Sequence, residues 1–456
     1  MLFNSYEFIF KFLIPIFIIF QYINNKDIKL YFLIITSIVF YYLNGLEPFL
    51  ILISSILINY WFAKNIQNRL KSKKKFLITI IIVNLLPLIY YKYAYSLSLI
   101  EESIIIPLAI SFYTFQQIAF QFDIYQKKID NITFKNYIFF VTFFPQLIAG
   151  PIVHYKGLIK QINFNKINIK YVEMGLILFS IGLFKKVILA NSLIPISNYS
   201  FDNIHTISSY DAWIGILAYS FEIYFDFSAY SDMAIGLALF FGIKLPINFN
   251  SPYKSINIRE FWRSWHITLS TFLKEHIYIP LGGNRVSIFR QSFNLLFTMI
   301  IAGIWHGSGL SFFLWGLIHG LLLVIYNIYN KNLYTIKIPK PISILITFII
   351  ITLLWVLFKV NNIDMALEYY KLLFSFNFDN INLKLSFEQL ILSKELLLIL
   401  MIVIVMFLPN SLEVSNYFKS DKKIKDRYIF VIALLLFISL KSMALIPKES
   451  FIYFNF

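Results

Sequence analysis

The sequence contains no cysteine and few charged residues. Of its 456 residues, 14% are charged, 15 are glycine and 14 are proline, whereas 59% are hydrophobic. Without cysteine the chain has no disulfide, no cysteine-ligated metal and no thiol nucleophile. It also lacks a polar stretch long enough to form a water-soluble domain. The hydrophobic content of 59% exceeds the apolar content of soluble domains, which is about 45–50%. The composition excludes a soluble enzyme and indicates one polytopic membrane protein.

The few charges are mostly positive, with a formal net charge of +16. They lie mainly in short loops between apolar runs, where lysine and arginine mark the cytoplasmic side of a membrane. The loop 64–75 is rich in these residues and has no acid. Placing it in the cytoplasm puts the amino terminus outside. The excess charge therefore indicates topology and membrane lipids as partners, and we expect no nucleic acid partner.

Apolar runs recur along the whole chain, and about 20 apolar residues cross a bilayer as one helix. The run 137–153 is interrupted by Pro145 and by Gly150-Pro151, so we expect it to enter the membrane and return as a hairpin. The sequence predicts an all-α polytopic integral membrane protein with about 11–13 membrane helices, re-entrant segments included, in a single domain 1–456. The predicted spans are 7–23, 30–43, 49–63, 76–96, 104–122, 172–195, 210–241, 289–305, 309–329, 341–358, 390–408 and 428–446.

Polar residues concentrate between 222 and 320, which contains four of the six histidines. Ionisable residues within spans are candidates for function, since a charge at the bilayer centre costs about 2.5 kcal/mol or more. The acids Glu222, Asp226 and Asp232 interrupt the span 210–241. Pairing with Arg259 or Arg263 as a scaffold would explain them, and a direct catalytic role is the alternative.

His306 lies between Trp305 and Gly307, close to a turn between two apolar runs. A partly desolvated imidazole is the usual general base for a hydroxyl. The alternative is a structural histidine hydrogen-bonded between helices.

Arg259, Arg263 and His266 are separated by four and three residues, which predicts that one helical face carries all three. Such a face could bind a phosphate or pyrophosphate group from the cytoplasm. The alternative is an interfacial helix whose tryptophans, at 262 and 265, form an aromatic belt. The glycine-rich stretch that ends at Arg285 predicts a turn, whereas His276 and His319 belong to no motif.

No metal site and no bound cofactor are expected. The sequence has no H-E-x-x-H pattern, no closely spaced histidine pair, no phosphate-binding P-loop and no G-x-S-x-G elbow.

Four strings in this region resemble the membrane-bound O-acyltransferase family, in particular the bacterial branch that contains alginate and peptidoglycan O-acetylation membrane proteins. They are IPLAISFYTFQQIAF, FFPQLIAGPIVHY, the run from YFDFSAYSDM to YIPLGGNR, and IIAGIWHGSGLSFFLWGLIHG. The resemblance covers a core of about 106–323. The helices of 1–105 and 341–456 match the family only as apolar segments.

The resemblance implies a transmembrane tunnel that joins a cytoplasmic donor site to an outer acceptor site. It puts His306 on the family's catalytic histidine and His266 on its second active-site position. It further implies acetyl-CoA as the donor and an extracytoplasmic partner resembling SGNH-type hydrolases. The expected setting is the bacterial cytoplasmic (inner) membrane, and the expected reaction is O-acetylation of an alginate-like exopolysaccharide or of peptidoglycan.

The residues and the resemblance together suggest roles for individual side chains. We expect His306 to act as general base, His266 or Trp305 to stabilise the oxyanion, and Asp226 to lie along the tunnel. Donor phosphates are expected on Arg259, Arg263 and Arg285. Two alternatives stay open: D-alanyl transfer from a carrier protein to teichoic acid, and a proton-coupled transporter or channel.

Overall fold

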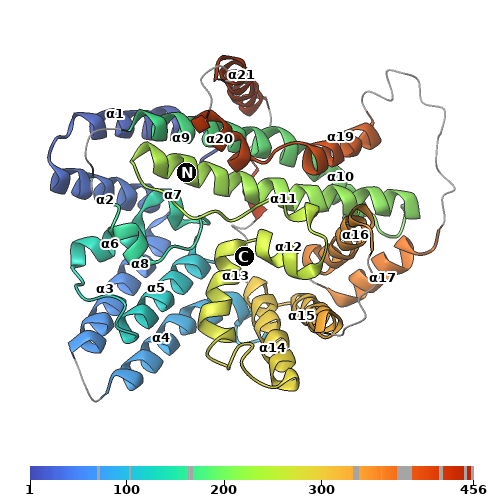
Figure 1. Cartoon of the computed structure of the whole chain (residues 1–456), viewed down its shortest axis with the longest axis horizontal. Helices are drawn as coiled ribbons and strands as arrows, with labels where there is room; N and C mark the ends of the chain where they lie inside the picture. The colour runs from blue at the N-terminus through green and yellow to red at the C-terminus, as the bar shows by residue number, and fades with distance from the viewer. Residues whose placement is uncertain are drawn as a thin grey trace. The chain divides into compact units, whose positions relative to one another are not determined.

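The computed structural model describes residues 1–68, 72–101, 104–162, 164, 168–331, 338–360, 362–376, 393–420, 425–445 and 449–452. All regular structure in these residues is helical (Figure 1). The chain forms two compact units, one from 1–184, 229–247 and 415–456 and the other from 185–228 and 248–414. The prediction of a single domain 1–456 stays a prediction.

The first unit contains the amino-terminal helices and the last helix. They are η1 (Glu7–Leu13), α1 (Ile14–Tyr22), α2 (Lys26–Tyr42), α3 (Leu46–Asn68), α4 (Lys73–Tyr93), α5 (Ile110–Tyr125), α6 (Phe134–Thr142), α7 (Phe144–Leu147), α8 (Tyr155–Ile159), α9 (Ile169–Phe184) and α21 (Lys425–Met443).

Most helices of the second unit come from the middle of the chain. They are η2 (Lys185–Ala190), α10 (Asn191–Asp202), η3 (Pro252–Lys254), α12 (Ile258–Ser264), α13 (Ile267–Leu273), η4 (Lys274–Tyr278), α14 (Ile288–His306), α15 (Leu310–Lys331), α16 (Lys340–Lys359), α17 (Ile363–Leu373) and α19 (Lys394–Phe407). Two helices belong to both units: α11 (Ser209–Phe240) joins the first unit from Ala229 onward, and α20 (Ser411–Ser420) from Ser415 onward.

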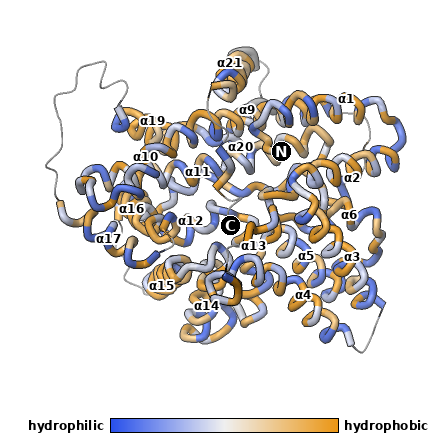
Figure 2. Tube along the Cα trace, turned by 180° about the vertical axis from the view of Figure 1, so that it is seen from behind, coloured by the Kyte–Doolittle hydropathy of each residue, from blue (hydrophilic) through white to orange (hydrophobic). Residues whose placement is uncertain are grey.

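The apolar runs become helices, as predicted. Five helices of the described part are long and apolar enough to cross a membrane, namely α3, α4, α14, α15 and α16, and the bent pair α19 and α20 would add a sixth. Figure 2 shows the apolar residues along α4 and α16. The all-α polytopic prediction is confirmed. The predicted total of about 11–13 also counts shorter and re-entrant segments.

Helix bounds differ from several of the predicted spans, and two of these differences have a local structural cause. The span 104–122 begins as α5 only at Ile110, because the residue before it, Ala109, has a left-handed backbone, with φ of 66°. The span 172–195 is divided: α9 ends at Phe184 and the π-helical turn η2 follows. Parts of three predictions lie outside the described residues: 69–71 of the basic loop 64–75, 390–392 of the span 390–408, and 446 of the span 428–446.

The broken segment 137–153 consists of two short helices, α6 and α7, followed by extended chain. α6 has nine residues and α7 has four, so neither is long enough to cross a bilayer. Pro145 lies in the first turn of α7, where its missing N–H is tolerated. The predicted interruption is therefore present, and the hairpin itself stays a prediction.

In the second unit, α14 and α15 pack backbone against backbone. A Cβ added to Gly303 would lie 2.3 Å from the carbonyl oxygen of Phe312, and one added to Gly316 would lie 2.4 Å from that of Met299. Glycine is required at both positions, since no side chain fits between the helices. The two helices thus form a close pair that carries many of the candidate site residues.

Candidate functional site

His306 is the last residue of α14 and is almost completely buried, with 2% exposure. Gly307 ends the helix in an extended conformation, and any Cβ there would lie 2.2 Å from the ring of Phe312. Three aromatic rings surround the imidazole, with centroids 4.6 Å away for Trp305, 5.2 Å for Trp315 and 5.0 Å for Phe358. The aromatic residues therefore hold this histidine in an apolar, water-poor position.

His266 is buried at a break between two helices. α12 ends at Ser264, and His266 itself has a left-handed backbone, with φ of 44°. The prediction that Arg259, Arg263 and His266 share one helical face is therefore wrong for His266. The physical cause is Asn248: its Oδ1 accepts hydrogen bonds from the backbone N and the hydroxyl of Thr268, and its backbone carbonyl accepts one from Ile267. These bonds start a new helix, α13, at Ile267.

The two histidines both lie next to the indole of Trp305. The ring of Trp305 is 6.2 Å from that of His266 and 4.6 Å from that of His306. The Nδ1 atom of His266 is 3.3 Å from Oδ1 of Asn248. Burial lowers the pKa of His266 to about 3, so its ring is neutral at pH 7. The structure thus brings His306, His266 and Trp305 together.

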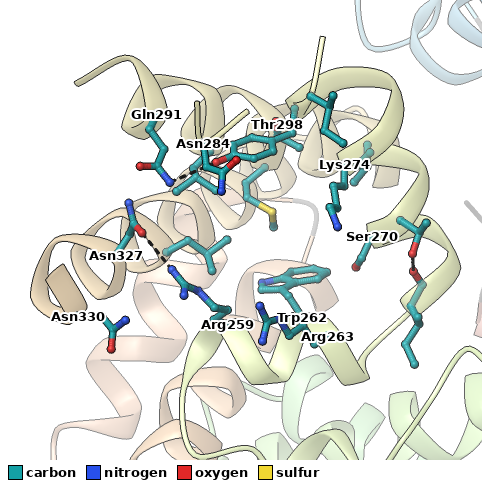
Figure 3. Close-up of a pocket in the computed structure, with 18 residues that line it drawn as sticks. Arg259, Trp262, Arg263, Ser270, Lys274, Asn284, Gln291, Thr298, Asn327 and Asn330 are labelled. Atoms are coloured by element: carbon teal, nitrogen blue, oxygen red, sulfur yellow. Dashed lines mark hydrogen bonds between the residues drawn. The ribbon is translucent and has the colours of Figure 1, made fainter. Parts of the chain in front are cut away.

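A pocket of about 810 Å³ opens among α12, α13, η4, α14 and α15. Three cationic side chains line it, those of Arg259, Arg263 and Lys274, and no acidic side chain does (Figure 3). Amide and hydroxyl groups supply the rest of its polar wall, from Ser270, Thr271, Tyr278, Asn284, Gln291, Thr298, Asn327 and Asn330. This chemistry suits a phosphate-bearing ligand.

The predicted arginines occupy different positions relative to this pocket. Arg259 and Arg263 line it, and Nη2 of Arg259 donates to Oδ1 of Asn327 at 3.0 Å. Arg285 does not line it, although its neighbour Asn284 does. Arg285 is exposed in the predicted glycine-rich turn, where Gly282 and Gly283 have positive φ.

Aromatic rings connect the pocket with His306. Trp262 lines the pocket, its ring is 5.7 Å from that of Trp315, and Trp315 in turn contacts His306. Trp262 and Trp265 have exposures of 8% and 1%, so the alternative of an interfacial belt at these positions is wrong. His306 does not line the pocket, and the predicted tunnel through the membrane stays a prediction.

Asp226 forms a buried ion pair with a residue that sequence reasoning did not single out. The ammonium of Lys186 lies 2.6 Å from Oδ1 of Asp226, and both side chains are at most 2% exposed. The predicted pairing of Asp226 with Arg259 or Arg263 is therefore wrong. Lys185 and Lys186 lie within the predicted span 172–195, in the part that forms η2. Two charged residues inside a predicted span are a signal in the sequence that could have identified them as partners of a buried acid.

No group of three or more histidine, aspartate or glutamate side chains in the described residues could hold a metal ion. The arrangement found here offers imidazoles, indoles and cations instead.

Comparison with known proteins identifies the class of chemistry. Residues 125–367 match the model of MBOAT, the membrane-bound O-acyltransferase family. The chain is 40% identical to a peptidoglycan O-acetyltransferase of Helicobacter pylori over 81% of this chain and 79% of that protein. It is 37% identical to the probable alginate O-acetylase AlgI of Pseudomonas aeruginosa, over 82% and 75% of the two chains.

A more distant similarity, 29% identity over 42% of this chain and 52% of the relative, connects it to a teichoic acid D-alanyltransferase of Bacillus subtilis. These similarities favour a transferase over the transporter or channel considered from the sequence. The apolar helices, the matched family model and the similarity over most of its length all agree: the chain belongs to the membrane-bound O-acyltransferase family and is a multi-pass membrane acyltransferase.

Proposed function

We propose that this protein transfers acetyl from acetyl-CoA across the bacterial cytoplasmic membrane to a hydroxyl, leading to O-acetylation of a cell-envelope polysaccharide such as peptidoglycan or an alginate-like polymer. Relatives named for peptidoglycan and alginate O-acetylation support the acceptor class. The observation that carries the donor assignment is the pocket with three cations and no acid, which the rings of Trp262 and Trp315 connect with His306.

In the proposed reaction, a ring nitrogen of His306 takes the proton of the acceptor hydroxyl. The hydroxyl oxygen attacks the thioester carbonyl, the carbon–sulfur bond breaks, and the same proton passes to the leaving thiolate. The products are an ester and free CoA, and no cysteine is needed. A positioned base contributes about 10²–10⁴-fold, and the aromatic enclosure keeps water from the thioester.

The donor's phosphates would be held by Arg259 and Arg263 and by Lys274. Arg285, exposed beside the pocket, would attract the anion rather than contact it in this conformation. To reach His306, the thioester has to pass Trp262. Trp305 is the proposed donor to the oxyanion, because an indole N–H can only donate. His266, neutral because of its burial, has its single ring proton on the Nδ1 that faces Oδ1 of Asn248, so its Nε2 is an acceptor and the role of His266 as an oxyanion donor is not proposed. We further propose that an extracytoplasmic partner resembling SGNH-type hydrolases receives the acetyl group and completes the transfer.

The test of the base is His306→Ala, expressed at the wild-type level and assayed for O-acetyl esters on envelope glycans by mass spectrometry. We expect a loss of about 100-fold or more. The matched control is His205→Ala, since His205 is 79% exposed and should leave the esters unchanged. Normal ester levels in the His306 variant would overturn the assignment.

The relative from Bacillus subtilis supports D-alanyl transfer from a carrier protein as the second candidate. Calorimetric titration with acetyl-CoA separates the two. A donor that fills the cationic pocket as a small molecule binds without any carrier, whereas a carrier-dependent transferase would show binding only with the acylated carrier protein.

A further inference from the structure

Asn248 is a buried side chain next to His266, in the segment between α11 and η3. Both residues are 1% exposed. The Oδ1 atom of Asn248 accepts from the backbone N of Thr268 at 3.2 Å and from its hydroxyl at 2.7 Å. Its backbone carbonyl accepts from the N of Ile267 at 3.0 Å. One asparagine thus holds the start of α13 and also lies against the ring of the histidine that precedes it.

The bond from the backbone of Thr268 identifies which amide atom faces His266. A backbone N–H can only donate, so the atom that it contacts is the oxygen of the Asn248 amide. An amide oxygen can only accept, and Nδ1 of His266 is 3.3 Å from it, so Nδ1 carries a hydrogen. Burial lowers the pKa of His266 to about 3, so the neutral ring has no second hydrogen at pH 7. Nε2 is therefore left with a lone pair.

Aromatic neighbours limit how the imidazole can turn. The ring of Phe227 lies 4.7 Å from it at an interplanar angle of 80°, and that of Trp305 lies 6.2 Å away at 63°. A half-turn of the imidazole would put a carbon atom in place of Nδ1 and break the contact with Asn248. The surroundings therefore fix both the orientation of the ring and the nitrogen that accepts.

We propose that Asn248 is a positioning residue of the acyl transfer: it fixes the tautomer of His266, so that Nε2 accepts a hydrogen bond from a reactant that carries a hydrogen. The oxygen and the sulfur of a thioester carry none, whereas the hydroxyl of the acyl acceptor and the thiol of the product do. Trp305, which can only donate, takes the thioester carbonyl. The identity of these reactants rests on the proposed function.

The tautomer can be measured by solid-state NMR on the full-length protein in lipid bilayers, with ¹⁵N-labelled histidine at pH 7. The signals of His266 are those missing from the spectrum of His266→Gln. We expect a protonated Nδ1 and an unprotonated Nε2 in the wild type. In Asn248→Leu, which has a side chain of similar size without an acceptor, we expect part of the molecules to carry the hydrogen on Nε2.

The kinetic readout separates orientation from donor binding. Asn248→Leu should lower kcat about tenfold, as is usual when a functional histidine loses its orienting partner. KM for acetyl-CoA should stay unchanged, because Asn248 does not line the cationic pocket. Asn248→Asp keeps an acceptor oxygen beside Nδ1 and should retain more of kcat than Asn248→Leu.

The matched control is Thr268→Val. It removes the hydroxyl that donates to the same Oδ1 at 2.7 Å and leaves the contact between Asn248 and His266 in place. We expect this variant to keep both the wild-type tautomer and the wild-type kcat. A purely structural role of Asn248, in holding α13, would be disturbed by both substitutions.

Titration with free CoA distinguishes the two sources of the hydrogen. If the thiol contacts Nε2, Asn248→Leu should bind CoA more weakly and acetyl-CoA as the wild type does. If the hydroxyl of the acceptor is the group bound, the affinities for CoA and acetyl-CoA should both stay unchanged. Weaker binding of acetyl-CoA itself would contradict the proposed separation of the reactants.

An unprotonated Nδ1 in wild-type His266 would overturn this inference without any variant and would leave the proposed function standing. So would equal losses of kcat in Asn248→Leu and Thr268→Val with the tautomer unchanged. A wild-type protein that does not transfer acetyl from acetyl-CoA would instead overturn the proposed function, and the NMR spectrum would still report the tautomer.

Discussion

Two groups of cations in the second unit differ in what surrounds them. Lys186 is buried and lies 2.6 Å from the carboxylate of Asp226. Arg259, Arg263 and Lys274 line a pocket that has no acidic side chain, and none of them forms an ion pair within the described residues. The same type of charge is therefore neutralised by a carboxylate at one place and lines a pocket without acidic side chains at the other.

This difference teaches how to assign roles to charged residues in a membrane enzyme. A buried cation with a carboxylate partner maintains the fold, because removing either partner leaves the other charge uncompensated. Cations without acids around an open pocket contribute little to stability and are available to bind anions. Substitutions in the two groups should accordingly affect different measurements.

The largest effect is expected for Lys186→Met. It leaves the carboxylate of Asp226 buried without its partner, which should reduce the free energy of unfolding by about 3–5 kcal/mol. Thermal unfolding in detergent, followed by tryptophan fluorescence, measures the loss. The double variant Lys186→Met with Asp226→Asn removes both charges and should recover most of the stability. If the single variant Lys186→Met were as stable as the wild type, the buried ion pair would not be what stabilises this part of the fold.

Gly316→Ala should have the next largest effect, because the new Cβ would lie 2.4 Å from the carbonyl oxygen of Met299 and push α14 away from α15. We expect a loss of about 1–3 kcal/mol in stability. Since α14 carries both His306 and part of the pocket wall, kcat and KM should change together. Gly157→Ala is the matched control, as its Cβ would meet nothing within 4 Å. Equal stability of the two variants would contradict the close helix contact.

Arg263→Gln should leave stability unchanged and raise KM for acetyl-CoA about tenfold, equivalent to about 1.4 kcal/mol of lost binding. The effect should shrink at high salt, because the side chain is exposed and its charge is screened. Arg290→Gln makes the same charge change on an exposed arginine outside the pocket and serves as the control. An equal KM increase in both variants would show a general charge effect rather than a binding site.

The smallest expected effect concerns pH. Burial lowers the pKa of His266 to about 3, against about 6.5 in the unfolded chain. Between these values the unfolded state binds the proton, so the stability due to the neutral ring is complete above about pH 6.5 and is lost as the pH falls toward 3. His266→Gln should reduce the dependence of the unfolding temperature on pH. An identical pH profile would show that the ring is solvated in the folded protein.

The sequence predicted the helices well because membrane spans need only length and apolarity. Residues 289–305 and 309–329, for example, became α14 and α15 with ends shifted by at most two residues. It could not predict the break at His266, since the residue that starts α13, Asn248, lies 18 positions earlier and acts only in the folded chain. Spacing alone favoured one continuous helix there.

Among the predicted site residues, the structure brings together those whose residue type carries its own chemistry. His306, His266 and Trp305 come together, and Arg259 with Arg263 lines the pocket. Sequence reasoning failed for partners that depend on tertiary structure: the counter-ion of Asp226 and the hydrogen bond to His319, which comes from Trp262 on α12. A histidine in an apolar helix does not reveal from its sequence neighbours which of its nitrogens is occupied.

The Lys186–Asp226 pair also has a consequence for how the protein is made. The two residues are 40 positions apart, so the lysine leaves the ribosome well before its partner. Alone at the centre of a bilayer, a lysine costs about 2.5–3.5 kcal/mol. Retaining η2 beside the translocon until α11 has been synthesised would avoid that cost, and the two segments would then enter the lipid together as a neutral unit.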